Sequence, residues 1–195
     1  MSFFDDVGEI PELPVLPEPV MHPWFGPPEF VIAGSVPGST VVFRNEKAAL
    51  IFDHFNAFQT GLQFTLNLWI REPDLKSRAQ WDPPWESHDF GPDLDNPDFL
   101  RLGMEFADGS KWTNLRPLPF GNPDEPPPGP IVVSQGGGGG RGSWSFQQWM
   151  WPLPPAGEIA VHATWPAQGV GETSVTIDAT PIVEAARRAE AVWPS

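Results

Sequence analysis

The stretch Leu62-Gln63-Phe64-Thr65-Leu66-Asn67-Leu68-Trp69-Ile70 decides the fold class, because its apolar and polar residues alternate strictly. Successive side chains of a β-strand point to opposite faces of the sheet. The three leucines, Phe64 and Ile70 therefore share one face, and the four residues between them share the other. This alternation predicts a half-buried strand in an antiparallel sheet.

Alternation of the same kind recurs along the chain between turns rich in Gly, Pro, Asn and Asp. Further strands are predicted at residues 30–33 with 40–44, 47–58, 100–106, 112–115, 131–134, 144–151, 159–165 and 174–177. The connections between neighbouring strands are too short for crossover helices, so the sheets should be mainly antiparallel. We expect an all-β antiparallel β-sandwich of about eight or nine strands, immunoglobulin-like or jelly-roll in style.

The two ends of the chain depart from this pattern. Residues 1–28 hold seven prolines, five acids and no base, together with apolar side chains such as Leu13, Leu16, Trp24 and Phe25. This composition predicts an extended, polyproline-like arm that packs on its own domain or on another subunit or partner. Residues 29–195 should form the sandwich domain, which ends in an α-helix at about 181–193 capped by Thr180.

Charge and composition exclude several classes of function. The formal net charge of −14 disfavours nucleic acid and membrane surfaces as partners, because both are anionic. The absence of cysteine excludes disulfides and thiol nucleophiles. No export signal or membrane-spanning stretch is evident, so we expect a cytoplasmic protein.

Two loop regions are candidate ligand sites. The glycine run at 136–140 is followed by Arg141 and Gly142, and residues 137–142 match a dinucleotide-binding pattern only formally, since no helix is predicted after them. A flexible hairpin loop is expected. The acidic loop from Glu72 to Asp98 offers Asp93, Asp95 and Asp98 as ligands for a cation such as calcium, against a solvated loop as the simpler interpretation. No cofactor is predicted.

Tryptophan and histidine supply the other candidate site. Trp69 beside Gln63, Thr65 and Asn67, together with His162, would suit a sugar ring that stacks on an aromatic face. The simpler interpretation is that a chain with ten tryptophans and no tyrosine uses tryptophan to fill its core. His54 beside Asp53, or His162, would be the base of a hydrolase, but no nucleophile motif accompanies them and we expect no enzyme.

Two segments of the C-terminal half, Trp149-Met150-Trp151-Pro152-Leu153-Pro154-Pro155 and residues 185–194, resemble actinobacterial β-rich proteins that have no assigned function. The resemblance covers less than half of the chain and implies no site residues.

The function expected from the sequence is therefore noncatalytic. An apolar arm on an acidic scaffold favours an interaction or structural accessory protein that contacts another protein, or a second copy, through Leu13, Leu16, Trp24 and Phe25 and through the acidic or Trp-bearing loops. The alternatives are a sandwich that binds a glycan or an apolar small molecule, and an acidic immunity-type inhibitor of a basic toxin.

Overall fold

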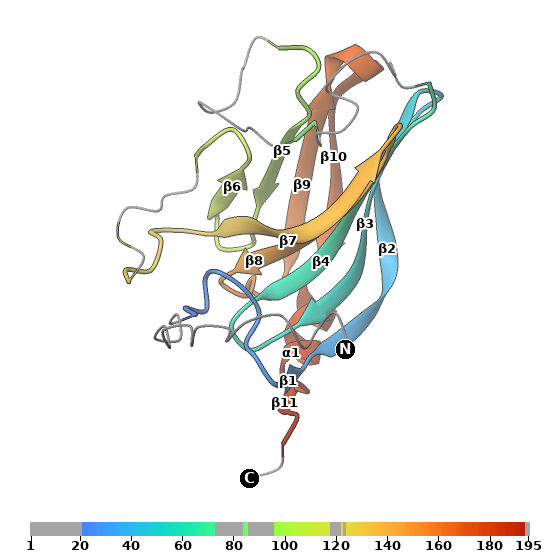
Figure 1. Ribbon diagram of the computed structural model, residues 1–195. Coiled ribbons are helices and arrows are strands. Elements are labelled where there is room, and N and C mark those ends of the chain that lie inside the picture. Colours follow the sequence, from blue (N-terminus) through green and yellow to red (C-terminus); the bar gives the residue numbers. More distant parts are fainter. Residues whose placement is uncertain (1–20, 73–83, 86–95, 118–121, 123, 194–195) are drawn as a thin grey trace, which may run out of the picture.

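Two antiparallel sheets face each other across one apolar core, as the alternation predicted (Figure 1). The structure, a computed structural model, describes residues 21–72, 84–85, 96–117, 122 and 124–193. The larger sheet contains, in spatial order, β2 (Gly34–Arg44), β3 (Ala48–Ala57), β4 (Leu62–Ile70), β8 (Ser143–Trp151) and β7 (Ile131–Gly140). The smaller sheet contains β10 (Val170–Asp178), β9 (Glu158–Trp165), β5 (Arg101–Glu105) and β6 (Lys111–Thr113), and a 3-10 turn at Pro166–Gln168 joins β9 to β10.

The core forms between the inner faces of β4 and of the smaller sheet. Leu62, Phe64, Leu66 and Leu68 are all buried, whereas the residues between them on β4 are partly or largely exposed. The inner residues of β9 and β5 meet them from the other sheet: Ile159, Val161, Ala163, Leu102 and Met104. Burial of these apolar faces stabilises the sandwich by about 25 cal/mol for each Å² removed from water.

The glycine run is a strand, so the expectation of a flexible loop was wrong. Residues 136–140 pair with β8 along the edge of the larger sheet, and the turn falls at Arg141–Gly142. A side chain at Gly137 or Gly139 would collide with the backbone of β8, since its Cβ would lie 2.6 Å from the Cα of Phe146 or of Trp144. Glycine at these positions therefore lets the edge strand pass close to its neighbour.

The C-terminal helix is shorter than predicted. Helix α1 spans Thr180–Ala186, and the chain then forms β11 (Glu190–Ala191), which pairs with β1 (Val31–Ile32). Thr180 is not the cap; its backbone N–H instead donates to Oδ1 of Asp178 at 2.8 Å. Hydrogen bonds from the Thr180 side chain and backbone lower the pKa of the Asp178 carboxyl below its ordinary 3.8. Among the described residues, no helix has the length and apolarity needed to cross a bilayer.

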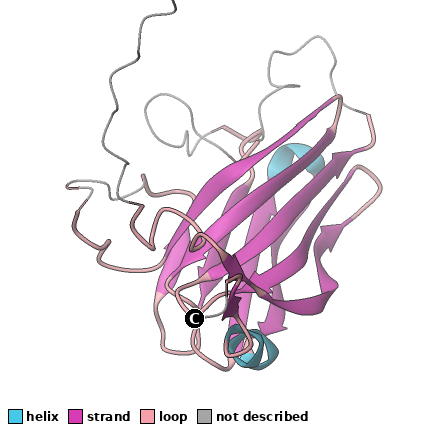
Figure 2. Cartoon of the chain, turned by 60° about the horizontal axis from the view of Figure 1, so that its bottom comes forward, coloured by secondary structure: helices cyan, strands magenta, loops and turns pink. Residues whose placement is uncertain are grey.

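Helix α1 closes one end of the sandwich, next to β1 and β11 (Figures 1 and 2). Its buried residues Ile182, Ala185 and Ala186 belong to the core. The helix ends at Ala186, short of the predicted residue 193, and Trp193 is 70% exposed. The helix lies so close to β2 that a Cβ on Gly34 would be 1.9 Å from the carbonyl oxygen of Ala185.

We expect Gly34→Ala to destabilise the fold by about 2–3 kcal/mol, because the added methyl has to push the helix backbone away from β2. Urea unfolding monitored by circular dichroism measures the loss. Gly171→Ala is the matched control, since a Cβ there would meet nothing within 4 Å. Equal stability of the two variants would contradict the close packing of α1 on β2.

Candidate functional site

The described end of the arm, residues 21–28, lies on the outer face of the larger sheet. Nε1 of Trp149 donates a hydrogen bond to the carbonyl oxygen of Pro23 at 3.0 Å, and Nε2 of Gln135 donates to that of Phe25 at 2.7 Å. Trp149 pairs with Gln63 on the outer face and is fully buried there, where it contacts this segment and the ring of Phe58, with 5.7 Å between ring centroids. The arm therefore packs on its own domain over the residues that the structure describes.

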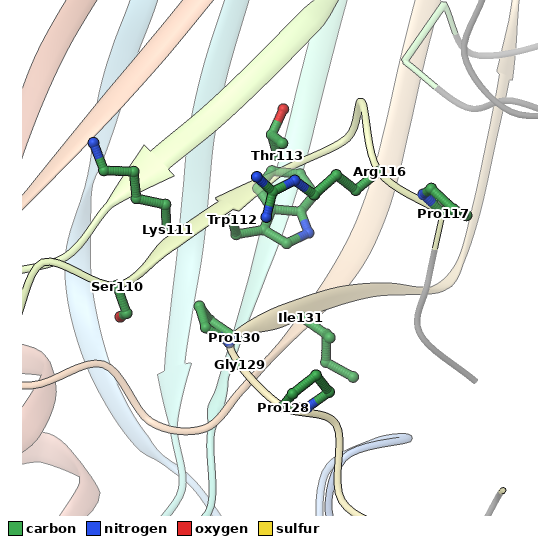
Figure 3. A pocket seen from close by; sticks show the side chains of 10 residues that line it. All are labelled: Ser110, Lys111, Trp112, Thr113, Arg116, Pro117, Pro128, Gly129, Pro130 and Ile131. Carbon is green, nitrogen blue, oxygen red and sulfur yellow. The ribbon is translucent and has the colours of Figure 1, made fainter. Parts of the chain in front are cut away.

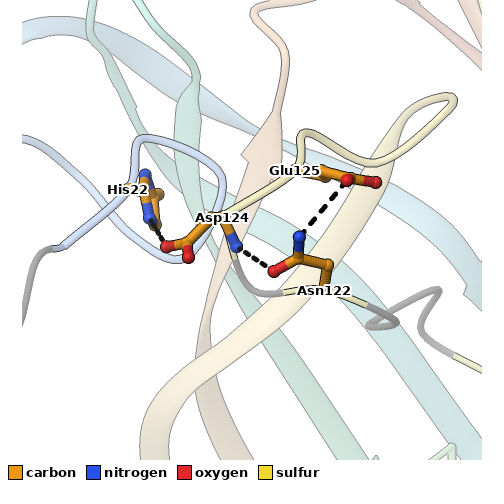
Figure 4. Close-up of polar contacts among 4 residues, drawn as sticks. All are labelled: His22, Asn122, Asp124 and Glu125. Carbon is orange, nitrogen blue, oxygen red and sulfur yellow. Dashed lines mark hydrogen bonds and ion pairs between the residues drawn. The ribbon is translucent and has the colours of Figure 1, made fainter.

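Trp24 fixes this segment through its aromatic ring. The ring stacks on His22 with 4.5 Å between centroids and meets Trp151 edge-on at 5.9 Å. His22 in turn contacts Asp124, with 3.0 Å between Nε2 and Oδ1, in a loop whose Asn122 and Glu125 also bond to each other (Figure 4). Trp24 is only 8% exposed and Phe25 is half-buried, so Trp24 is used within its own chain. Leu13 and Leu16 lie outside the described residues.

The outer face of the larger sheet holds a shallow polar pocket of about 520 Å³, here called the sheet-face pocket. The predicted Gln63 and Thr65 line it together with His54, which the sequence offered only as the base of a hydrolase. The other lining residues, which sequence reasoning missed, come from neighbouring strands: Asn56, Ser145, Gln147, Gln135 and the glycines 136 and 137. Asn67 and Trp69 continue the same row of β4. Trp69 is 43% exposed between the small residues Ala49 and Ser143.

His162 does not join this row, contrary to prediction. It lies on β9 in the smaller sheet, where it pairs with Gly103 and Ser174, and its neighbours Val161 and Ala163 point into the core. The two outer faces are on opposite sides of the sandwich. A ligand that touches Gln63 and Thr65 therefore does not reach His162.

His54 lines the sheet-face pocket and has an unusual backbone conformation. Its φ of 52° accompanies a bulge in the pairing between β3 and β4. Oδ1 of Asp53 accepts a hydrogen bond from the His54 backbone N–H at 2.7 Å, and Oδ2 lies 3.4 Å from Nδ1 of the ring. Asp53 thus orients an exposed imidazole toward solvent beside the pocket.

A second hollow, the β6–β7 groove, lies where the edge strands of the two sheets diverge. It consists of two adjoining cavities of about 370 and 420 Å³ that share Ser110 and residues 128–130. Lys111, Trp112 and Arg116 line the first cavity on the β6 side, opposite Pro128, Pro130 and Ile131 (Figure 3). The second cavity is lined by Trp151 and by prolines, namely Pro127, Pro128, Pro130, Pro152, Pro154 and Pro155.

The first cavity carries positive charge and the second a negative charge. Nζ of Lys111 lies 3.0 Å from Oε2 of Glu105, whereas Arg116 makes no ion pair within the described part of the chain. In the second cavity Oδ1 of Asp108 accepts two hydrogen bonds from Ser110, one from its hydroxyl at 2.6 Å and one from its backbone N–H at 2.9 Å. These bonds lower the pKa of the Asp108 carboxyl, which keeps that group ionised.

The remaining predictions concern the acidic loop and the tryptophans. Asp93 and Asp95 lie outside the described residues, and the exposed Asp98 uses its backbone carbonyl to accept from Nε1 of Trp165 at 2.9 Å. The described residues contain no cluster of three potential metal ligands. Trp85, Trp144 and Trp165 belong to the core, as expected for a core that uses tryptophan, whereas Trp149 is buried on the outer face of the larger sheet.

The groove was only partly visible in the sequence. The prolines of residues 117–130 are visible in the sequence, but Trp112 and Arg116 lie far along the chain from Trp151. Only the pairing of β5 with β6 and of β8 with β7 brings them to one side of the sandwich.

Comparisons of the chain with protein-family models, with curated proteins and with solved structures find no match.

We expect Trp24→Ala to destabilise the chain by about 3 kcal/mol, because it removes a buried ring from the segment that covers Trp149. Hydrogen exchange should become faster at residues 22–26, and urea unfolding should shift to lower concentration. Trp193→Ala removes the same side chain from an exposed position and should change stability by less than about 0.5 kcal/mol. A Trp24→Ala protein as stable as the control would contradict the packing described above.

Proposed function

We propose that this protein is a noncatalytic binding protein whose β6–β7 groove takes an acidic, proline-rich segment of a protein. The observation that supports this most directly is the composition of the groove. Two tryptophans and a wall of prolines adjoin Lys111 and Arg116, in a chain with a net charge of −14. Apolar rings next to cations suit a ligand that is itself apolar along one edge and acidic along another.

A polyproline II helix is the peptide conformation that suits such a groove. It has three residues per turn and no internal hydrogen bonds, so its side chains form three straight edges. Proline-rich segments already populate this conformation and lose little entropy on binding, and aromatic-lined grooves recognise them. Trp112 and Trp151 provide aromatic surface at the two cavities of this groove.

Charge favours an acidic rather than a basic ligand. Arg116 lies exposed at the edge of the first cavity, and its guanidinium pairs well with carboxylates because it offers several donors in one plane. The carboxylate of Asp108 would repel an acid in the second cavity, so we place the acidic residues of the ligand at the first cavity.

The second candidate function is binding of a neutral polyhydroxylated ligand, such as a glycan, in the sheet-face pocket. Amide and hydroxyl groups of Asn56, Gln63, Thr65, Ser145 and Gln147 gather there on rigid strands. Such groups both donate and accept hydrogen bonds, which suits sugar hydroxyls. Trp69 provides an exposed ring on the same row of β4.

The groove is tested with two labelled peptides, (Glu-Leu-Pro)4 and (Lys-Leu-Pro)4, by fluorescence anisotropy. We expect the full chain to prefer the glutamate peptide, and Arg116→Glu to reduce the ratio of the two affinities by about tenfold or more. The ratio isolates the charge of the groove, because anything else that occupies the groove competes equally with both peptides. Added salt should also reduce the preference.

Arg141→Glu is the matched control, because Arg141 is an exposed arginine in the β7–β8 turn. It should leave the ratio unchanged. If Arg116→Glu and Arg141→Glu change the ratio equally, the groove is not the binding site.

The sheet-face pocket is tested by titrating soluble hexasaccharides into the full chain in a calorimeter. We expect Gln63→Ala with Thr65→Ala to weaken binding by about tenfold, because each hydrogen bond contributes about 1 kcal/mol. Thr176→Ala, an exposed threonine on β10 in the other sheet, should have no effect. The absence of heat with every sugar would count against the glycan interpretation.

A further inference from the structure

The two shortest strands of the molecule form an exposed apolar surface. β1 and β11 pair with each other and with no strand of the two main sheets, and Figure 1 shows them beyond helix α1 at one end of the sandwich. We call residues 29–32 and 187–193 the β1–β11 ribbon. Of the seven large apolar side chains that are exposed in the described part of the chain, four belong to it: Phe30, Ile32, Val192 and Trp193.

The apolar side chains of the ribbon take no part in the core. Among the described residues, neither the core nor the partly buried side chains packed against it include a member of the ribbon. A two-stranded ribbon is only marginally stable unless its side chains pack against another surface. A surface that covers this one would therefore stabilise it.

The backbone of Phe30 holds its ring in solvent. Its φ is 54°, in the left-handed region that a bulky side chain rarely occupies. Its carbonyl oxygen accepts a hydrogen bond from the backbone N–H of Val192 at 2.8 Å, yet the residue is 66% exposed. Strained residues of this kind are concentrated at sites that bind or switch. The conformation of Phe30 thus favours a contact made by its ring.

The charge of the ribbon permits a second copy of the chain to approach. Two copies repel each other at long range, because each has a net charge of −14. The ribbon, however, contains two acids, Glu29 and Glu190, and two bases, Arg187 and Arg188, and all four are exposed. Its charges balance, so no net repulsion opposes contact between two ribbons.

The acids and bases are also arranged for contact between two copies. The centre of the ribbon is the pair Val31 and Ala191. Glu29 lies beyond one end of this short ladder, and Arg188 lies beyond the other end, where its Nη2 donates to the carbonyl oxygen of Ser35 at 3.4 Å. A two-fold axis through the centre reverses the second ribbon, so Glu29 of each copy faces Arg188 of the other.

We propose that the β1–β11 ribbon is a docking surface for a second copy of this chain. The symmetric dimer buries the four exposed apolar side chains between two pairs of opposite charges. This inference does not depend on the proposed function, because no residue of the ribbon lines the β6–β7 groove.

The test is sedimentation equilibrium of the full chain. The interface is small, so we expect a transient dimer with a dissociation constant of about 0.1 mM. The buffer contains about 0.15 M salt, because the long-range repulsion is then screened beyond about 8 Å. A chain that remains monomeric at millimolar concentration overturns the inference.

Charge reversal tests the two-fold arrangement. Glu29→Arg and Arg188→Glu each place like charges opposite one another twice, so each variant alone should dimerise about tenfold more weakly. An equal mixture of the two variants should recover the original affinity as a heterodimer, because every arginine again faces a glutamate. Arg44→Glu is the matched control, since Arg44 is exposed at the end of β2, and it should change the dissociation constant by less than about twofold.

Removal of the rings tests the apolar contact. Phe30→Asn with Trp193→Ser should weaken the dimer by about tenfold or more. Asparagine tolerates the left-handed conformation, so the variant should keep its fold, which circular dichroism checks. Val41→Ser with Trp69→Ser removes two exposed apolar side chains from β2 and β4 instead and should leave the dimer intact.

Three results would overturn the proposed arrangement even if a dimer forms. The mixture of Glu29→Arg and Arg188→Glu could fail to restore it, Arg44→Glu could weaken it as much as Arg188→Glu does, or the Val41/Trp69 variant could lose it while the Phe30/Trp193 variant retains it. Each of these results would place the contact elsewhere on the chain.

Discussion

Burial of the inner face of β4 against the smaller sheet is the interaction on which the rest of the structure depends. Leu62, Phe64, Leu66 and Leu68 fix which side of the central strand faces inward. A slip of one residue would turn Gln63, Thr65 and Asn67 into the core, at a cost of several unpaired polar groups. The same register therefore sets the polar row on the outer face and makes the sheet-face pocket a direct consequence of core packing.

The sandwich has a closed side and an open side, and this asymmetry explains where the groove lies. On the closed side β10 and β2 are in contact and helix α1 packs against β2 and β3. On the open side the edges belong to β6, which has only three residues, and to β7, whose first residue Ile131 lines the groove. Trp112, Trp151 and the prolines of two loops line the rest of the space at these edges and leave a groove.

Much of this fold could be predicted from the sequence, because strands with one buried face carry their own pattern. The period of two in residues 62–70 is visible without any neighbour, and so is the turn at Asp108-Gly109, where Gly109 has a φ of 81°. The prediction of a loop at the glycine run was wrong because glycines carry no side chains that would show an alternating pattern. Glycine is needed there because the strand lies so close to the backbone of Phe146 and Trp144. The sequence predicted only part of the sheet-face pocket. Gln63 and Thr65 could be identified because they share a strand, whereas Asn56 and Gln147 join them through pairing across strands. His162 was misplaced because the same alternation occurs in both sheets.

The net charge of the chain opposes the encounter with a free acidic peptide. A chain with a net charge of −14 repels a separate acidic peptide at long range, and this lowers the rate of encounter at low salt. At physiological salt the repulsion is screened beyond about 8 Å, so the contacts of Arg116 and Lys111 act only once the peptide is near. An acidic peptide that binds the groove therefore depends on these short-range contacts and on its apolar contact with Trp112 and Trp151.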